Sequence, residues 1–133
     1  RWRIEEFHKT WKHTCHIEET QLRSVQAIET WAIILAAVAM RTERLKRTSR
    51  QSPEEPATLE LSKAEIEAVI VLKNPKGYRR GDIPSIGIVV RWIAELGGYT
   101  GYASSGPPGA VTIGRGLKRI EPVVIALKNL KNL

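Results

Sequence analysis

A long helical repeat of apolar residues between Leu22 and about Arg47 constrains the fold more than any other feature. Apolar residues three or four positions apart are typical of an amphipathic helix. One face is traced by Leu22, Val25, Ile28, Glu29, Ala32, Leu35, Ala36 and Ala39. The centre, Trp31 to Met40, is apolar nearly all round, so we expect neighbours to cover it on more than one side. The C-terminal residues of this helix, 41–47, are basic; their charge complements the helix dipole and could also contact phosphate.

Composition sets outer bounds on class and partners. The chain has 133 residues, enough for one domain or one domain and a partial one. Its formal charge of +7 favours a polyanionic partner. The single cysteine, Cys15, excludes an internal disulfide, so we expect a reducing compartment. No uninterrupted apolar run reaches the roughly 18 residues of a membrane span, so no membrane partner is expected. The chain begins with Arg1 and its only methionine is Met40, so we expect a piece of a longer protein.

The first twelve residues carry two stripes if they form a helix. Each residue of a helix advances about 100° around its axis, so residues three or four positions apart lie close together in one stripe. The polar stripe is Arg1, Glu5, His8 and Lys12, and the apolar stripe is Ile4, Phe7 and Trp11. From periodicity alone, the polar stripe is either a solvated charged face or a carboxylate flanked by cations for a functional purpose.

The letters at these positions resemble the end of a known signature. Arg1, Glu5 and Lys12 match the Arg, three residues, Glu, six residues, Lys of cut-and-paste insertion-sequence transposases of the DDE type. The signature's Tyr would lie three positions before Arg1. The resemblance continues over residues 14–22 and returns at Leu96-Gly97-Gly98-Tyr99 and Gly106-Pro107-Pro108-Gly109.

This resemblance implies a role for each matching residue. In such enzymes two Asp and one Glu on a ribonuclease-H-like core hold two divalent ions, Mg²⁺ or Mn²⁺, for strand cleavage and transfer. Glu5 would be the third, metal-binding acid. Arg1 would hold a phosphate near the transposon end, and Lys12 a phosphate of the terminal strand. Only one of the three acids can be placed, so we expect this chain alone to be inactive and the activity to belong to the parent.

The resemblance also divides the chain. Residues 1–48 would hold the end of the ribonuclease-H-like domain plus the long helix, 49–61 a linker, and 62–133 a helical C-terminal domain that pairs protomers. The expected fold class is mainly α, a helical bundle whose first helix is the last catalytic helix and whose sheet is absent. The expected partners are transposon-end DNA and a second copy, in the bacterial cytoplasm near the nucleoid.

Two other functions remain open at this point. One is a basic helical module that binds DNA or dimerises without chemistry. The other is a helical fragment whose charge only solubilises it. DNA binding that depends steeply on salt would separate the first from the second.

Local signals predict the remaining helices. Ser62 and Glu65 form a capping-box pattern, and that helix should end before Asn74-Pro75. Asp82 is a candidate cap for a helix from Ile83 or Pro84 to Leu96. A last amphipathic helix from Ile113 to about Leu130 contains Pro122, which would kink it or start a separate helix.

Three smaller features stay ambiguous. Tyr78, in the basic loop 73–81, could stack on a base or pack on the rim of the domain. His8, His13, Cys15 and His16 could bind zinc, but without a second ligand cluster a buried Cys15 is the simpler interpretation. The last helix departs from the resembled family at Ala110, Gly114 and Leu117, where tryptophans are frequent, and Gly114 and Gly116 should weaken its start.

Overall fold

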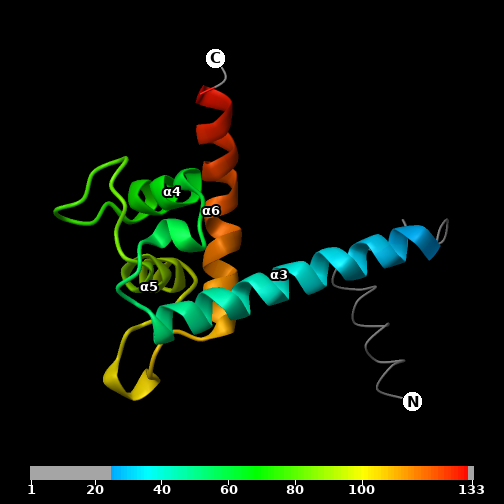
Figure 1. Cartoon of the computed structure of the whole chain (residues 1–133), viewed down its shortest axis with the longest axis horizontal. Helices are drawn as coiled ribbons and strands as arrows, with labels where there is room; N and C mark the ends of the chain where they lie inside the picture. The colour runs from blue at the N-terminus through cyan, green and yellow to red at the C-terminus, as the bar shows by residue number, and fades with distance from the viewer. Residues whose placement is uncertain (1–24, 132–133) are drawn as a thin grey trace. The chain divides into compact units, whose positions relative to one another are not determined.

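The computed structural model describes residues 25–131 and shows a mainly helical chain, as the sequence predicted (Figure 1). Four α-helices and two short 3₁₀ turns follow one another: α3 Val25–Gln51, η1 Ala57–Leu59, α4 Lys63–Lys73, α5 Ile86–Leu96, η2 Ala103–Ser105 and α6 Ala110–Lys131. Within these residues there is no strand, only an isolated antiparallel bridge between Pro56 and Ser85. The predicted helix over residues 1–12 lies outside the described residues. The chain divides into two compact units, Arg1–Ala37 and Val38–Leu133.

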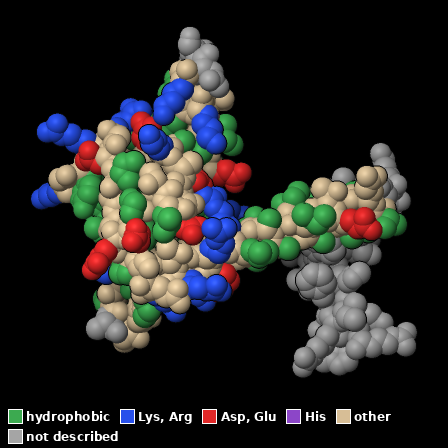
Figure 2. All heavy atoms as spheres, in the orientation of Figure 1, with side chains coloured by type: hydrophobic (Ala, Val, Ile, Leu, Met, Phe, Trp, Pro, Cys, Tyr) green, Lys and Arg blue, Asp and Glu red, His purple; other side chains and the backbone are tan. Residues whose placement is uncertain are grey.

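Helix α3 is the expected long helix, but its apolar centre is not covered. Residues 31–40 are all exposed, with Ile33 69% and Met40 66% exposed, so the expected burial of this stretch was wrong for the described part of the chain. Only Thr42 and Leu45 of α3 are buried. Figure 2 shows hydrophobic side chains along much of this helix.

By length and composition α3 is also apolar enough to cross a membrane. One helix of this kind is by itself weak evidence for a membrane.

The core of the second unit lies where α4, α5 and α6 meet the end of α3. Figure 1 shows α4 and α5 beside α6, the last and central helix of this unit. Burial of large aliphatic side chains is the main favourable term in such packing. The largest fully buried side chains are Leu45, Ile66, Val69, Ile86, Val89, Val90, Ile93, Ile113 and Ile120.

Helix α4 begins with the predicted capping box. The Glu65 N–H donates to Ser62 Oγ at 3.2 Å, and the Ser62 N–H donates to Glu65 Oε1 at 2.9 Å. These bonds satisfy two of the N–H groups that a helix start leaves unpaired. The helix ends at Lys73, as predicted, but Asn74 caps it in the left-handed conformation, with φ 47°. Asn is one of the few non-glycine residues that adopts this region readily.

Helix α5 begins at Ile86, and Asp82 does not cap it. Asp82 instead accepts a hydrogen bond from the Arg79 N–H at 2.8 Å, which closes a loop. The first N–H groups of α5 donate to another segment: Ile86 N to Glu55 O at 2.6 Å and Gly87 N to Pro53 O at 3.0 Å. The start is therefore set by tertiary contacts, which a local cap signal cannot reveal.

The segment expected as a linker, 49–61, contributes to this packing. Ala57 and Leu61 are buried in the core, and the Ala57 N–H donates to Pro84 O at 3.0 Å. The division of the chain into domains remains a prediction.

Helices α5 and α6 meet at two glycines. A Cβ at Gly116 would overlap the Ile93 carbonyl, and a Cβ at Gly97 would overlap the Thr112 carbonyl. Gly116, one of the two glycines expected to weaken α6, therefore permits the close approach of α6 to α5. Pro122 lies inside α6, which runs as one helix from Ala110 to Lys131.

The predicted apolar face of α6 docks on its own chain. Ile120, Val124 and Leu127 are buried, whereas Leu130 is 63% exposed. Arg119 also ties α6 to the end of α5, since its Nη1 donates to Leu96 O at 3.2 Å.

Candidate functional site

The predicted catalytic and phosphate-binding residues lie outside the described part of the chain. Glu5, Arg1 and Lys12 all precede residue 25, and so do His8 and Cys15. Among residues 25–131, no group of three or more His, Cys, Asp or Glu is placed to hold a metal ion. The described surface instead offers two grooves and several clusters of charged side chains.

The positive charge of the chain is concentrated in its second unit. Residues 38–133 carry 16 Lys or Arg and nine Asp or Glu, whereas residues 1–37 carry five of each. Figure 2 shows Lys and Arg on several parts of the visible face. Most acids of this unit are paired with a cation, as in Arg44–Glu60 at 3.0 Å and Lys73–Glu95 at 3.7 Å. The excess charge is therefore carried by exposed cations.

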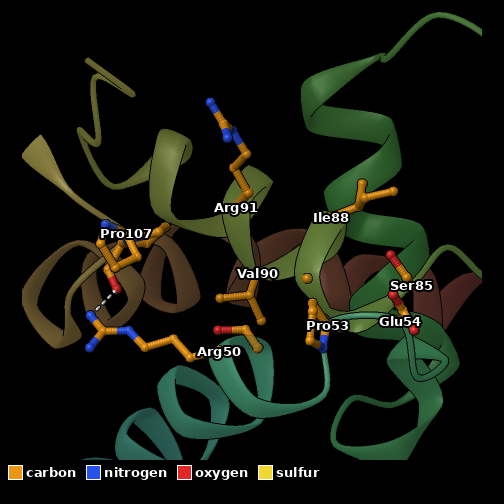
Figure 3. A pocket seen from close by; sticks show the side chains of 11 residues that line it. Arg50, Pro53, Glu54, Ser85, Ile88, Val90, Arg91 and Pro107 are labelled. Atoms are coloured by element: carbon orange, nitrogen blue, oxygen red, sulfur yellow. Dashed lines mark hydrogen bonds between the residues drawn. The ribbon is translucent and has the colours of Figure 1, made fainter. Parts of the chain in front are cut away.

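A groove of about 700 Å³ runs between the end of α3, the first half of α5 and the turn at Pro107-Pro108 (Figure 3). Figure 3 shows Arg50 and Arg91 on opposite sides of Val90. Arg50 Nη2 donates to Pro108 O at 3.0 Å, and the Arg91 guanidinium lies 5.9 Å from the centre of the Tyr99 ring. Both arginines are thus positioned by the domain itself.

The base of this groove is formed by close contact between Gly87 and Pro53. A Cβ at Gly87 would lie 2.8 Å from Pro53 Cβ, so a larger residue would force the segments apart. Pro53, Ile88, Val90 and Pro107 make the lining largely apolar, and Glu54 adds one carboxylate. A single carboxylate in such a lining is too few oxygen ligands to hold a divalent ion.

A second hollow, of about 300 Å³, lies among α3, α4 and α6. Gly114 and Leu117 of α6 line it together with Val38 of α3. At its edge Arg41 Nη2 donates to both oxygens of Glu65, each at 2.6 Å. Burial raises the pKa of the Glu65 carboxyl, but the hydrogen bonds from Arg41 and Ser62, together with the charge of Arg41, outweigh it. The pKa of Glu65 is therefore below its ordinary value.

The third feature is a cluster of cations around Glu67. Arg80 Nη2 lies 2.7 Å from Glu67 Oε1, and Lys131 Nζ lies 3.8 Å from Glu67 Oε2. Tyr78 of the neighbouring loop packs edge-on against Trp92, with ring centres 4.9 Å apart, so the rim-packing interpretation of Tyr78 is confirmed. One partly buried carboxylate thus brings together cations from the loop and from the end of α6.

Comparison with known protein families decides the identity of this unit. Residues 37–131 match the family described as the transposase Tn5 dimerisation domain. The chain belongs to the transposase Tn5 dimerisation domain family. No curated protein and no solved structure gives a significant match to the chain.

The family match agrees with the fold. It starts at Ala37, next to the boundary at which the second compact unit begins, and it ends with the last residue of α6. The dimerisation domain thus comprises the core described above, the groove, the hollow and the cations around Glu67. The resemblance to transposases is confirmed at the level of the family.

Several features of the dimerisation domain were not found from the sequence. Glu67, Arg80 and Lys131 were not grouped together, because they come from α4, a loop and α6. The Arg41–Glu65 pair joins residues 24 positions apart. Only the closely spaced cations of the loop gave any signal in the sequence.

Proposed function

We propose that this chain pairs two protomers of a DNA transposase, as the C-terminal part of that enzyme. The observation that carries the proposal is the match to the transposase Tn5 dimerisation domain over residues 37–131, which includes three of the four described helices and most of α3. The partner of this domain is then a second copy of the same chain. A two-fold pair would use the same surface on both copies.

The exposed stripe of α3, three of whose four residues precede the start of the family match at Ala37, is the surface that best suits such pairing. Trp31, Ile34, Leu35 and Val38 lie within about 100° of one another around the helix, in line with Thr42 and Leu45. Thr42 and Leu45 are buried, whereas the first four side chains are exposed. No charged residue stands between Glu29 and Arg41. A contiguous apolar face of this kind marks an interaction site, since leaving it in water is unfavourable.

Light scattering on two matched variants tests the pairing. Leu35→Glu with Val38→Glu places charges on the α3 stripe, and these side chains are already exposed, so folding should be preserved. We expect the unmodified chain to elute as a dimer and this variant as a monomer. The control, Val71→Glu with Leu72→Glu on α4, adds the same charge at two other exposed apolar residues and should stay dimeric. A monomeric unmodified chain would contradict the proposal, and a dimeric Leu35/Val38 variant would assign pairing to another surface.

The catalytic part of the proposal concerns the first twelve residues. In the intact DDE-type parent, Glu5 would be the third acid for Mg²⁺ or Mn²⁺, and Arg1 and Lys12 would hold phosphates of the transposon end. The support is the spacing of these residues, Arg, three residues, Glu, six residues, Lys. The chain alone supplies one acid of three, so it should not cut DNA. Metal-dependent cleavage by the pure chain, lost in Glu5→Ala, would contradict this prediction.

A non-catalytic basic module for DNA binding or dimerisation remains the alternative function. The excess of 16 Lys or Arg over nine Asp or Glu in residues 38–133 favours it. In the parent, neutralising Arg1 and Lys12 should weaken transposon-end binding if the catalytic proposal holds. In a generic binder, the basic loop over residues 76–80 should dominate instead.

A further inference from the structure

The loop between α4 and α5, residues 74–82, has a conformation set by its own backbone. Asn74, Gly77 and Gly81 have φ values of 47°, 84° and 95°, a region that favours glycine and asparagine. The Asp82 carboxylate accepts a hydrogen bond from the Arg79 N–H at 2.8 Å. The side chains of Lys76 and Arg79 take part in none of these bonds among the described residues, and both residues are exposed. The loop thus presents two cations that its own folding does not use.

The aromatic residue of this loop, Tyr78, is occupied by packing, so we expect the loop to contact phosphates and not bases. Tyr78 packs edge-on against Trp92 at 4.9 Å, with an angle of 84° between the rings. A side chain held in this way is used for packing on α5 and does not offer a free ring to an unstacked base. Stacking on aromatic faces is a means of holding unpaired bases of single strands, whereas hydrogen bonds to base edges read the sequence of a duplex. The cations of the loop carry no such information.

Three further cations complete the group: Arg80 in the loop itself, and Lys63 and Lys131 beside it. Arg80 and Lys131 share the carboxylate of Glu67, whose side chain is 14% exposed while theirs are 63% and 65% exposed. Lys63 lines a small hollow of about 150 Å³ together with Gly81, Asp82 and Lys131. One carboxylate therefore holds cations from two elements in place without neutralising them all. We call the group Lys63, Lys76, Arg79, Arg80 and Lys131 the basic end.

We propose that the basic end binds the phosphodiester backbone of duplex DNA without reading its sequence. Lys and Arg contacts to phosphates release condensed counterions, which makes binding strong at low salt and steeply salt-dependent. The basic end has five cations against Glu67 and Asp82, and the Asp82 carboxylate is already bonded within the loop. The inference rests on the proposed function in one respect, that a transposase protomer works on DNA, and it concerns sequence-independent binding, not the transposon-end contacts proposed for Arg1 and Lys12.

Fluorescence anisotropy with labelled duplexes tests the proposal on the full 133-residue chain. The loop pair, Lys76→Gln with Arg79→Gln, removes two cations whose side chains bond to nothing among residues 25–131. The control pair, Arg47→Gln with Arg115→Gln, removes the same charge from exposed residues of α3 and α6. Arg115 and Lys131 are separated by roughly 24 Å of helix rise, so the control pair does not belong to the basic end. Two duplexes of equal length and unrelated sequence are titrated across a salt series.

The loop pair should lower the slope of log affinity against log salt by about two, one for each lost phosphate contact. Affinity at about 0.1 M salt should fall about tenfold, equally for both duplexes, while the control pair keeps most of the affinity and slope. Equal losses in the two pairs would overturn the proposal, because net charge alone would then explain binding. An unchanged slope in the loop pair, or a strong preference for one duplex, would also overturn it.

Sedimentation of the same variants separates this inference from the pairing of protomers. The loop pair should sediment like the unmodified chain, since its cations are distant from the α3 stripe in sequence and lie on other elements. If the unmodified chain is monomeric and the loop pair weakens its DNA binding, the pairing of protomers is contradicted and the proposal for the basic end is supported. If the unmodified chain is dimeric and the loop pair leaves DNA binding unchanged, the pairing is supported and the proposal for the basic end is contradicted.

Discussion

Gly97 at the end of α5 and Gly116 in α6 allow two helix backbones to approach more closely than side chains would permit. A Cβ at Gly116 would overlap the Ile93 carbonyl, whereas a Cβ at Gly114, two residues earlier, would lie 4.0 Å from the Thr42 side chain. The same residue type therefore has opposite roles at two nearby positions of α6. Gly116 is required by packing, and Gly114 only adds freedom to the unfolded chain.

Alanine substitutions at these glycines should separate the two roles. Gly116→Ala and Gly97→Ala should lower the free energy of unfolding by about 1–3 kcal/mol, because the added methyl group overpacks a backbone contact. Gly114→Ala should raise it by up to about 1 kcal/mol, since Ala favours the helix. Urea unfolding of the three variants gives the comparison. A similar loss in all three would contradict the close approach of α5 and α6.

Glu65 connects the start of α4 to α3 through one carboxylate. It accepts hydrogen bonds from the Ser62 N–H of its own helix and from Arg41 of α3, and these lower its pKa despite burial. A carboxyl whose pKa is lower in the folded state stabilises the fold above its unfolded pKa. That stabilisation is lost as the pH falls through the folded pKa.

Replacing Glu65 should therefore flatten the acid side of the stability profile. The unmodified chain should lose stability as the pH falls below about 4.5, the ordinary value for this carboxyl. Glu65→Gln should be less stable at neutral pH and should lose less over the same acid range. Thermal unfolding across an acid pH series measures both. Parallel profiles for the two proteins would show that Glu65 titrates alike in both states.

At the scale of elements, α6 keeps its continuity in spite of Pro122. Proline lacks the N–H that would bond to the carbonyl of Lys118, four residues earlier, and its ring crowds that carbonyl. The residue is exposed, so no core contact offsets this cost. Pro122→Ala should raise the free energy of unfolding by about 1–3 kcal/mol, measured in urea. A loss of stability would mean that Pro122 contributes contacts that the exposed position does not suggest.

Elements with local signals were predicted well from the sequence. The capping box of Ser62 and Glu65 and the end of α4 at Lys73 depend on neighbouring residues only. The start of α5 was placed two or three residues early, because its first N–H groups bond to the backbone at Pro53 and Glu55, some thirty residues away. Tertiary capping of this kind leaves no local pattern.

The α3 helix shows a different limit of sequence reasoning. Its existence followed from apolar periodicity, although it continues to Gln51, beyond the expected end near Arg47, and the same apolarity also led to an expectation of burial. In the described chain, residues 31–40 are exposed. Periodicity can predict that a face needs a partner, yet it cannot predict whether the same chain supplies that partner.

For the candidate sites, the sequence predicted residue types better than groupings. The Gly97-Gly98-Tyr99 and Gly106-Pro107-Pro108-Gly109 letters pointed to the transposase family, and the family match over residues 37–131 confirms that relationship. The groove beside Arg50 and the junction at Glu67 could not be predicted, because each assembles residues from three separate segments. Glu5, Arg1 and Lys12 lie outside the described residues and stay predictions.

At the scale of the whole molecule, an apolar stripe and a basic end would serve separate tasks. The α3 stripe contains no charge between Glu29 and Arg41 and would pair protomers, while the cations around Glu67 would hold DNA.

Sedimentation equilibrium of the unmodified chain over a wide concentration range tests the pairing of protomers most directly. The monomer mass is 14.9 kDa. We expect a fitted mass near twice this value at high concentration, falling towards the monomer on dilution, as mass action requires. A mass of 14.9 kDa at every concentration would contradict the proposal that this domain joins two protomers.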